Sequence, residues 1–320
     1  TEIPTDLSSG LNKESSSIEI FDTEKIESTP SLYIADGSKS LFTKNTHEST
    51  APMGWVYLTL VERRQLTHDT YIYKFDFPEG DEDMVMGTNI SRPLKFHVYL
   101  QTPEHPEGEI VKRYYTTSSP VDMKGSVEVP IKIYRKTEEY PNGGIFTSWL
   151  ETIPIGSKLL TEGPKKRIEY YGQGLVRIQD VMFRKKKFGF VAGGTGITPF
   201  YKLIQTALEN NDPSHFTLLY CNKTEDDVMF GEEIAEWARL YPDNFTYKQA
   251  ISNPKDVSNL GEDILVGYMT AAWLNEHLPP PGDDIFIGMM GPPPMEETFE
   301  DIIKNHTEYD RETMVWLRYH

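Results

Sequence analysis

Between residues 54 and 171, short runs of β-branched and aromatic residues alternate with turns that are rich in proline, glycine and aspartate. Such runs, separated by polar turns, predict antiparallel strands that close into a barrel. The predicted strands cover 55–61, 70–77, 94–101, 109–116 and 126–134, with 158–162 and 167–171 as candidates to complete the barrel. A short helix is predicted at 143–150. We therefore expect an antiparallel six-stranded barrel domain over residues 51–175.

After residue 187 the pattern changes to short apolar runs, each followed by a segment whose apolar residues recur at helical spacing. The predicted pairs of strand and helix are 188–192 with 199–209, 216–220 with 231–241, 244–250 with 270–277, and 284–288 with 295–305. Strands that alternate with helices favour a doubly wound parallel sheet. We therefore expect an α/β domain over residues 176–320, including a last apolar stretch around Trp316.

Residues 1–50 differ from both patterns. They are rich in serine, threonine, glutamate and aspartate, and their scattered apolar residues show no period. Alone, a segment of this composition buries too little apolar surface to fold. We predict an extended polar arm, which becomes ordered most easily on the surface of a larger assembly.

One junction between strand and helix is rich in glycine: the range Gly193–Gly196 reads Gly-Gly-Thr-Gly and follows the apolar run 187–191. Glycine lets the backbone turn tightly and approach a ligand closely. Free N–H groups and the helix dipole favour a phosphate at such a helix start. Thr198 fits the N-cap position and Pro199 the first helical position. Alone, the stretch is equally consistent with an ordinary turn of an α/β domain.

A second motif, Arg113-Tyr114-Tyr115-Thr116, stands at the end of a predicted barrel strand. Arginine offers a planar fork to a phosphate. Tyr115 points to the same face as Arg113 because side chains alternate along a strand, and Thr116 adds a hydroxyl and a backbone N–H. Together they are able to hold a flavin nucleotide. The alternative is an edge strand with an exposed arginine.

Two further motifs contain glycine or proline at the start of a predicted helix. The range 143–150 opens with two glycines, whose N–H groups are suited to a pyrophosphate. Its alternative is a glycine turn capped by Thr147 or Ser148. The range 290–295 reads Met-Gly-Pro-Pro-Pro-Met and follows a predicted strand, where open α/β sheets place their ligands. Its alternative is a rigid proline loop.

Composition excludes several classes of protein. A length of 320 residues allows two domains. The net charge of -17 argues against nucleic acid as the main partner, because phosphate binding needs a basic surface. The lone Cys221 allows no disulfide framework, and the eight histidines show no metal-ligand spacing, so we expect no metal site. No apolar run approaches the ~20 residues of a membrane span. If the chain associates with a membrane, we expect it to do so peripherally, through a partner.

In this order the motifs resemble those of the NADH-cytochrome b5 reductase family, within the wider ferredoxin–NADP reductase superfamily, over about residues 54–316. The resemblance implies an FAD-binding barrel followed by an NAD-binding domain. It implies that FAD is held by Arg113, Tyr115, Thr116, Lys132, Tyr134, Gly143, Gly144 and Thr147. It implies that NADH is held by Gly194, Thr195, Gly196, Thr198, Asp227, Gly291, Pro292 and Met295.

The family resemblance also implies a reaction. Hydride passes from NADH to the flavin, and electrons then leave singly to a haem or iron–sulfur protein. Thr116 is expected beside the flavin ring and Met290 beside the nicotinamide. Asp227 is expected at the adenine ribose, where its carboxylate favours NADH because it repels a 2′-phosphate.

The sequence departs from the family at four places. Met290 replaces a cysteine before Gly-Pro-Pro-Pro-Met, Lys95-Phe96-His97 replaces Gly-Gln-His, and Lys166 replaces a glycine near the flavin. The chain also runs on through Trp316 to His320, where family members end in an aromatic residue. These departures are expected mostly around the contact between flavin and nicotinamide.

Two hypotheses follow from the motifs and the departures. The first is a working NADH-dependent flavoprotein reductase with a redox protein as acceptor. The second is a reductase-like accessory subunit of a large mitochondrial membrane complex, which keeps FAD and has weakened or no turnover. The basic runs 165–167 and 184–187 are able to dock an acidic redox partner or an anionic membrane, although such runs are more often simply solvated. The expected location is mitochondrial, or otherwise the cytoplasmic face of a membrane.

Overall fold

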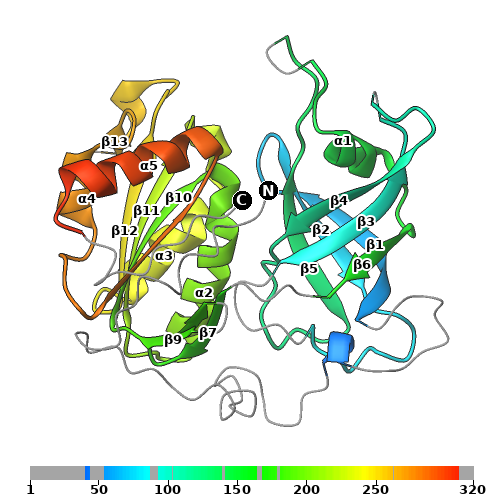
Figure 1. Cartoon of the computed structure of the whole chain (residues 1–320), viewed down its shortest axis with the longest axis horizontal. Helices are drawn as coiled ribbons and strands as arrows, with labels where there is room; N and C mark the ends of the chain where they lie inside the picture. Colours follow the sequence, from blue (N-terminus) through cyan, green and yellow to red (C-terminus); the bar gives the residue numbers. More distant parts are fainter. Residues whose placement is uncertain are drawn as a thin grey trace.

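The computed structural model describes residues 40–43, 54–86, 93–102, 104–138, 141–163, 168–178, 181–261 and 263–309. Within these ranges the chain forms two halves, a curled antiparallel sheet and a parallel sheet covered by helices (Figure 1). Most of the predicted arm, Lys166 and the stretch from Trp316 to His320 lie outside the described residues. None of the helices in the described part of the chain combines the length and apolar character needed to cross a membrane.

The first half is the predicted six-stranded sheet. Its strands are β1 (Trp55–Gln65), β2 (Thr70–Asp76), β3 (Leu94–Leu100), β4 (Glu109–Tyr115), β5 (Ser126–Lys132) and β6 (Lys158–Glu162). They pair antiparallel in the order β4-β3-β6-β1-β2-β5. The inward residues of each strand, such as Phe75 and Phe96, form one apolar core with Phe146 of α1 (Ile145–Thr152). A 3₁₀ turn, η2 (Leu41–Thr43), adds Leu41 to this core.

The strand predicted at 167–171 does not complete the barrel, which is a correction. It forms β7 (Ile168–Gly172) in a separate three-stranded sheet with β8 (Leu175–Ile178) and β9 (Val181–Arg184). The reason is an anchor on the other half of the molecule. The buried Tyr170 hydroxyl donates to Asp212 Oδ2 at 2.8 Å and lies 3.2 Å from Ser214 Oγ. This sheet therefore packs on the parallel half.

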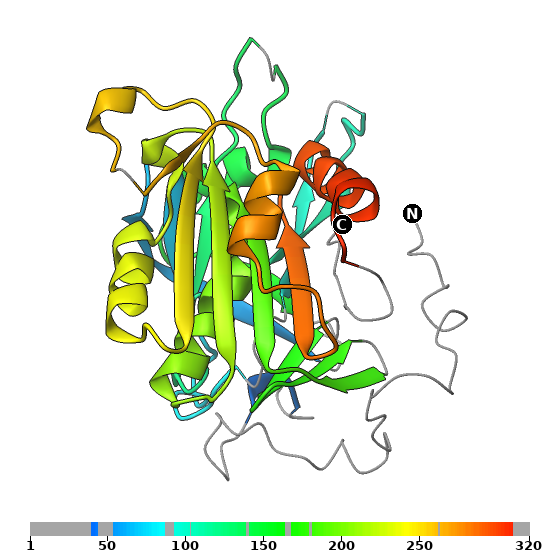
Figure 2. The same ribbon diagram turned by 90° about the vertical axis from the view of Figure 1, so that its left-hand side faces the viewer.

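The second half is the predicted doubly wound sheet. Its parallel strands are β10 (Lys187–Gly193), β11 (His215–Asn222), β12 (Phe245–Ile251), β13 (Leu265–Val266) and β14 (Ile285–Met290), in the order β13-β12-β11-β10-β14. Figure 2 looks onto these strands, with β14 at the edge next to β10. Its helices are α2 (Ile197–Glu209), α3 (Gly231–Leu240), α4 (Ala271–His277) and α5 (Pro293–His306), and its 3₁₀ turns are η3 (Gly194–Gly196), η4 (Glu225–Asp227) and η5 (Val257–Asn259).

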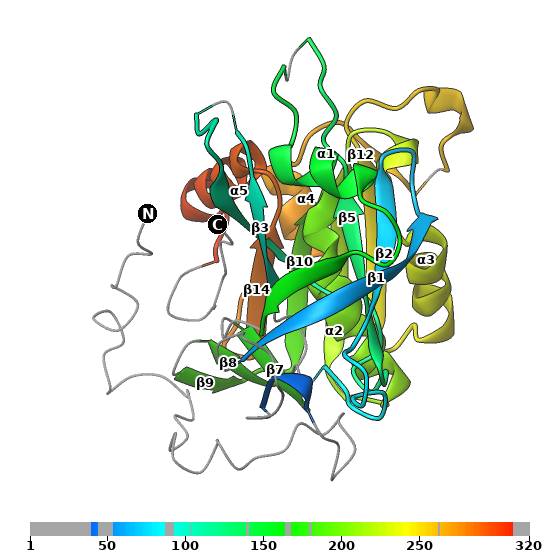
Figure 3. The same ribbon diagram turned by 90° about the vertical axis from the view of Figure 1, so that its right-hand side faces the viewer.

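Alternation along β10 shows that this sheet has two buried faces. Phe190 belongs to the apolar cluster that includes α2 and α3, whereas its neighbour Val191 belongs to the cluster that includes α4 and α5. The first cluster also contains Ile72 of β2 and Val121 from the barrel half. Figure 3 shows the same arrangement from the barrel side, with β1, β2 and β5 in front of α2. Helix α2 is thus packed between the parallel sheet and the barrel half.

The N-cap prediction for Thr198 is wrong. Helix α2 begins at Ile197, and its N-cap residue is Gly196. The reason is that η3 leads directly into the helix, since Gly196 already has helical angles of φ -62 and ψ -11. The Thr198 hydroxyl instead donates to the Thr195 carbonyl at 3.2 Å.

Candidate functional site

A cavity of about 1440 Å³ lies where the two halves meet. It is bounded by the ends of β4 and β5 on the barrel side and by the carboxyl ends of the parallel strands on the other. Its volume exceeds the ~300–1,000 Å³ of ordinary small-molecule sites, so a ligand that extends across both halves has room there. The predicted site residues that line it are Tyr115, Thr116, Lys132, Tyr134, Gly194, Thr195, Gly196, Thr198, Asp227, Met290, Gly291, Pro292 and Met295.

On the barrel side, the end of β4 places Tyr115 and Thr116 at the cavity. The Tyr115 ring packs on Phe146 of α1, with ring centroids 5.7 Å apart. Burial raises the pKa of the Tyr115 phenol well above its ordinary value, so the group stays protonated across the physiological range. Thr116 is 7% exposed. A neutral phenol and a hydroxyl therefore line this wall.

Four of the predicted FAD-binding residues do not line the cavity in the described structure. The Arg113 side chain is exposed, and its guanidinium donates to the Lys112 carbonyl at 2.8 Å. Gly143, Gly144 and Thr147 lie at the start of α1, where the Thr147 hydroxyl accepts a hydrogen bond from the Tyr134 N–H at 3.2 Å. Their roles toward FAD stay predictions.

On the parallel side, the glycine turn packs closely on the loop after β14. A Cβ atom on Gly196 would lie 2.1 Å from the Met290 carbonyl oxygen, and one on Gly193 would lie 2.5 Å from Met295 Sδ. Gly194 has φ +52, and a Cβ atom there would meet open space. No side chain caps α2, but the Ile197 N–H is bonded to the carbonyls of Gly194 and Thr195, and Pro199 has no N–H. Anion binding at this helix start stays a prediction.

Met290 lines the cavity and is at the same time part of the apolar core. It is 3% exposed and packs in the apolar cluster with Phe190, Phe200 and Ala192, while also reaching the cavity wall. The thioether expected beside the nicotinamide therefore serves mostly as core. Its role in hydride transfer stays a prediction.

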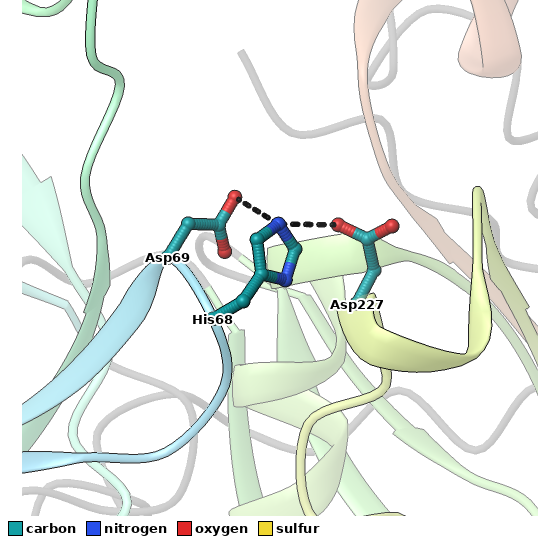
Figure 4. Close-up of side chains that lie close together, drawn as sticks. All are labelled: His68, Asp69 and Asp227. Atoms are coloured by element: carbon teal, nitrogen blue, oxygen red, sulfur yellow. Dashed lines mark ion pairs between the residues drawn. The ribbon is translucent and has the colours of Figure 1, made fainter.

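A polar cluster joins the two halves at one end of the cavity. Lys132 Nζ of β5 lies 2.9 Å from Asp69 Oδ2 and 3.2 Å from Asp227 Oδ1. His68 Nε2 lies 3.4 Å from Asp69 Oδ2 and 4.0 Å from Asp227 Oδ1 (Figure 4). Asp227 Oδ2 also accepts hydrogen bonds from the Thr224 N–H and hydroxyl, at 3.0 and 2.7 Å. Asp227 is therefore held from both halves of the molecule.

The cluster shifts the pKa values of its two central groups, Asp227 and Lys132. Burial alone raises the pKa of Asp227, but hydrogen bonds from Thr224 and the charge of Lys132 outweigh it and lower the pKa below its ordinary value. Burial alone lowers the pKa of Lys132, but the two carboxylates outweigh it and raise the pKa. At neutral pH Lys132 and Asp227 are therefore both charged.

Three potential metal ligands meet in this cluster, because the ligand atoms of His68, Asp69 and Asp227 all lie within 4.8 Å of one another. Spacing in the sequence did not reveal them, since they come from two domains. The Lys132 ammonium already supplies a positive charge between the two carboxylates. We therefore assign this cluster to an ion-pair network rather than to a metal.

Replacing Lys132 by methionine is expected to lower the free energy of unfolding by about 1–3 kcal/mol at neutral pH, because two partly buried carboxylates lose their cation. Asp227 has a lowered pKa in the folded state, so its contribution is present above its unfolded pKa of about 4 and is lost as the pH falls through the folded value. The difference between wild type and variant should therefore shrink toward about pH 3. Chemical denaturation from pH 3 to pH 8 measures it.

A matched control is Lys186→Met, which removes an exposed lysine 3.2 Å from the exposed Asp284. Exposed pairs contribute about 0–1 kcal/mol, so this variant should be nearly neutral. Equal effects of the two substitutions, or an effect of Lys132→Met that does not depend on pH, would contradict the network.

The remaining sequence features lie away from the cavity or outside the described residues. Lys95 and His97, two of the family departures, contact the same oxygen of Glu162 at 3.0 and 3.1 Å. Lys95 lies over the ring of Tyr114, which lines the cavity, but does not line it itself, so its place near the contact of flavin and nicotinamide stays a prediction. In the run 184–187, the Lys185 ammonium is bonded to the Asp283 carbonyl at 2.6 Å. The run 165–167 is outside the described residues.

Sequence reasoning missed several residues of the cavity wall. Asn222, Ser252, Asn253 and Tyr268 line it after the carboxyl ends of β11, β12 and β13. The signal that would have indicated them is the rule that ligands lie beyond the carboxyl ends of parallel strands. The half-buried Cys221 also lines the cavity, and desolvation raises the pKa of its thiol to about 12.

The two halves match two known domains. Residues 57–170 match the model of the oxidoreductase FAD-binding domain, and residues 190–301 match that of the oxidoreductase NAD-binding domain. The crystal structure of the cytochrome b5 reductase domain of Ulva prolifera nitrate reductase has a TM-score of 0.74 and 24% identity, covering 83% of this chain and 98% of that one. The fold and cavity thus define an oxidoreductase that binds FAD and NAD.

Two relatives narrow this class. NADH-cytochrome b5 reductase 2 of Homo sapiens is 34% identical over 250 residues, which are 75% of this chain and 86% of that protein. Nitrate reductase [NADH] 1 of Zea mays is 34% identical over 248 residues, which are 76% of this chain but 38% of that protein. The chain belongs to the NADH-cytochrome b5 reductase family. It spans well under half of the nitrate reductases that it matches.

Proposed function

We propose that this chain is an NADH-dependent flavoprotein reductase, which passes electrons through FAD to a one-electron acceptor protein. The observation that carries the proposal is one cavity lined by predicted residues from both halves, which are Tyr115, Thr116, Lys132 and Tyr134 of the FAD-binding half and all eight predicted residues of the NAD-binding half. A cavity of this size between the two domains lets both cofactors reach one place.

The residues present fit FAD and NADH. Open space beside Gly194 lets a pyrophosphate approach the backbone of the glycine turn closely. On the opposite wall, Thr116 offers a buried hydroxyl and Tyr134 a half-exposed ring. FAD, when bound, supplies the chemistry that accepts a hydride and releases single electrons. The protein's own contribution is to bind and orient the two cofactors and to exclude water from the space between them.

Asp227 supports a preference for NADH over NADPH. Its lowered pKa keeps it ionised at the cavity wall, and a carboxylate there repels a 2′-phosphate. For the acceptor, we propose a haem protein of the cytochrome b5 type, which the name of the human relative supports. The mitochondrial location expected from the sequence stays a prediction.

The test is anaerobic titration of the FAD-loaded protein with NADH. The flavin absorbance should bleach with about one equivalent of NADH, since one hydride reduces one flavin, and cytochrome b5 should then be reduced. Dithionite serves as the control that the bound flavin is reducible. Protein that binds FAD, bleaches with dithionite and does not bleach with NADH would rule out the proposal and leave the accessory-subunit hypothesis in its place.

A further inference from the structure

Lys202 is a lysine that the cavity chemistry does not use. It lies on α2 and is 2% exposed. Its ammonium donates to the Thr117 hydroxyl at 2.7 Å, and Thr117 is 0% exposed. Lysine is almost never fully buried unless it is paired with a carboxylate. A hydroxyl partner without a carboxylate therefore calls for an explanation.

The bond lies between the two halves of the molecule. Thr117 directly follows Thr116 at the end of β4, while Lys202 follows the glycine turn by less than two helical turns. The neighbours of Lys202 on the helix, Tyr201 and Leu203, share an apolar cluster with Ile72 and Val121 of the barrel half. One polar bond in an apolar interface thus joins the strand end predicted to face the flavin to the helix predicted to bind the dinucleotide.

Stability does not explain this arrangement. Desolvating an amine costs free energy that one hydroxyl partner returns incompletely, and apolar side chains of similar volume often replace buried charged groups without loss. The amine instead adds a directional contact between the two halves. A hydrogen bond fixes the distance between two backbones more narrowly than apolar contact does, because it depends on both length and angle.

We propose that Lys202 is a positioning residue for hydride transfer, which acts through Thr117 to hold the Thr116 strand end at a set distance from α2. The spacing of the flavin and nicotinamide subsites across the cavity follows from that distance. This inference rests on the proposed function for its kinetic consequences. Its geometric part depends on Lys202 and Thr117 alone.

The proposal has a consequence for pH. Burial lowers the pKa of Lys202 to about 7, and no charged group in the described part of the chain changes it. The charged groups around α2 instead shift the pKa of Tyr201 and the pKa values of one another. These groups are Arg64, Asp122, Glu128, Glu209 and Glu233. The protonated amine only donates hydrogen bonds, whereas the neutral amine is also able to accept one from the Thr117 hydroxyl. The donor and the acceptor of this hydrogen bond are therefore able to exchange roles near neutral pH.

Stability of the protein without cofactors gives one readout. The folded pKa of Lys202 is lower than the unfolded value of about 10.4, so the unfolded state binds more protons between the two values. The free energy of unfolding of wild type should therefore rise with pH from about 7 to about 10, relative to Lys202→Met. Neither FAD nor NADH is needed for this measurement. A matched control is Lys186→Met, which removes an exposed lysine.

Flavin reduction gives the second readout, by anaerobic stopped flow with saturating NADH from pH 5.5 to 9. Wild type should show an inflection near pH 7. Lys202→Met should lose the inflection and reduce its flavin about 10- to 100-fold more slowly, since a shift of about 1 Å costs on that order. Its dissociation constant for FAD should stay within about threefold, because Lys202 does not line the cavity. Lys202→Gln, which keeps a donor that does not titrate, should recover rate without recovering the inflection.

The outcomes separate the two proposals. FAD-loaded wild type that does not bleach with NADH overturns the proposed function and, with it, this positioning role. Wild type that bleaches, together with a Lys202→Met protein of the same rate and pH profile, overturns this inference alone. If Lys202→Met does not fold, Thr117→Val tests the same bond from the other side. That variant should slow flavin reduction as Lys202→Met does, and an unchanged rate would overturn the inference.

Discussion

Replacement of Gly196 by alanine is expected to abolish the reduction of bound FAD by NADH while FAD itself stays bound. The added Cβ would lie 2.1 Å from the Met290 carbonyl oxygen and 2.5 Å from the Met290 carbonyl carbon. These are backbone atoms, so the turn and the loop after β14 must separate. Both segments line the cavity on its NAD-binding side. We expect a loss of at least about 100-fold in the rate of flavin reduction, because misplacement by about 1 Å costs that much.

Two alanine substitutions serve as controls for this prediction. At Gly261 a Cβ atom meets nothing within 4 Å and φ lies outside the left-handed region, so Gly261→Ala should behave as wild type. At Gly194 the space is open but φ is +52, so Gly194→Ala tests backbone strain in the same turn without the clash. FAD content and melting temperature show whether the barrel half stays folded. Full activity of Gly196→Ala would show that the turn and loop do not need this close approach.

Much of the fold was predictable because each half repeats one hydrophobic pattern. The run at 216–220 predicted β11, which spans His215–Asn222, since a buried parallel strand is continuously apolar. Strands β8 and β9 were missed because four residues are too few to show a period. The turn that joins β7 to β8 contains Gln173 with φ 50, a conformation that the sequence does not indicate.

The candidate site was predictable where local rules apply. A strand end in the barrel and a strand-to-helix turn in the parallel sheet were each expected to face a ligand, and Thr116 and Gly194 line the same cavity. What was not predictable is how the two domains contact each other. Lys132 and Asp227 are 95 residues apart, and Thr117 and Lys202 are 85 apart. No pattern within one domain encodes such a pair, since it depends on how both surfaces meet.

Asp227→Ser is expected to shift the nucleotide preference from NADH toward NADPH. The reason lies in the ion pair between Lys132 and Asp227. The carboxylate that repels a 2′-phosphate is removed, and Lys132, which lay 3.2 Å from it, gains freedom to approach the phosphate. We expect the ratio of kcat/KM for NADPH to that for NADH to rise about 10- to 100-fold, which corresponds to about 1.4–2.7 kcal/mol. Steady-state kinetics with both nucleotides at one ionic strength measure the ratio, since salt screens such charges.

The adjacent Asp226 provides the matched control for Asp227→Ser. It carries the same charge in the same 3₁₀ turn, but its side chain is exposed, pairs with Lys255 and does not line the cavity. Asp226→Ser changes the net charge by the same amount, so it reports any general electrostatic effect on nucleotide binding. If the effect is specific to position 227, the ratio should stay within about twofold of wild type in this control. Equal shifts in both variants would show that net charge, rather than the carboxylate held by Lys132 and Thr224, sets the choice of nucleotide.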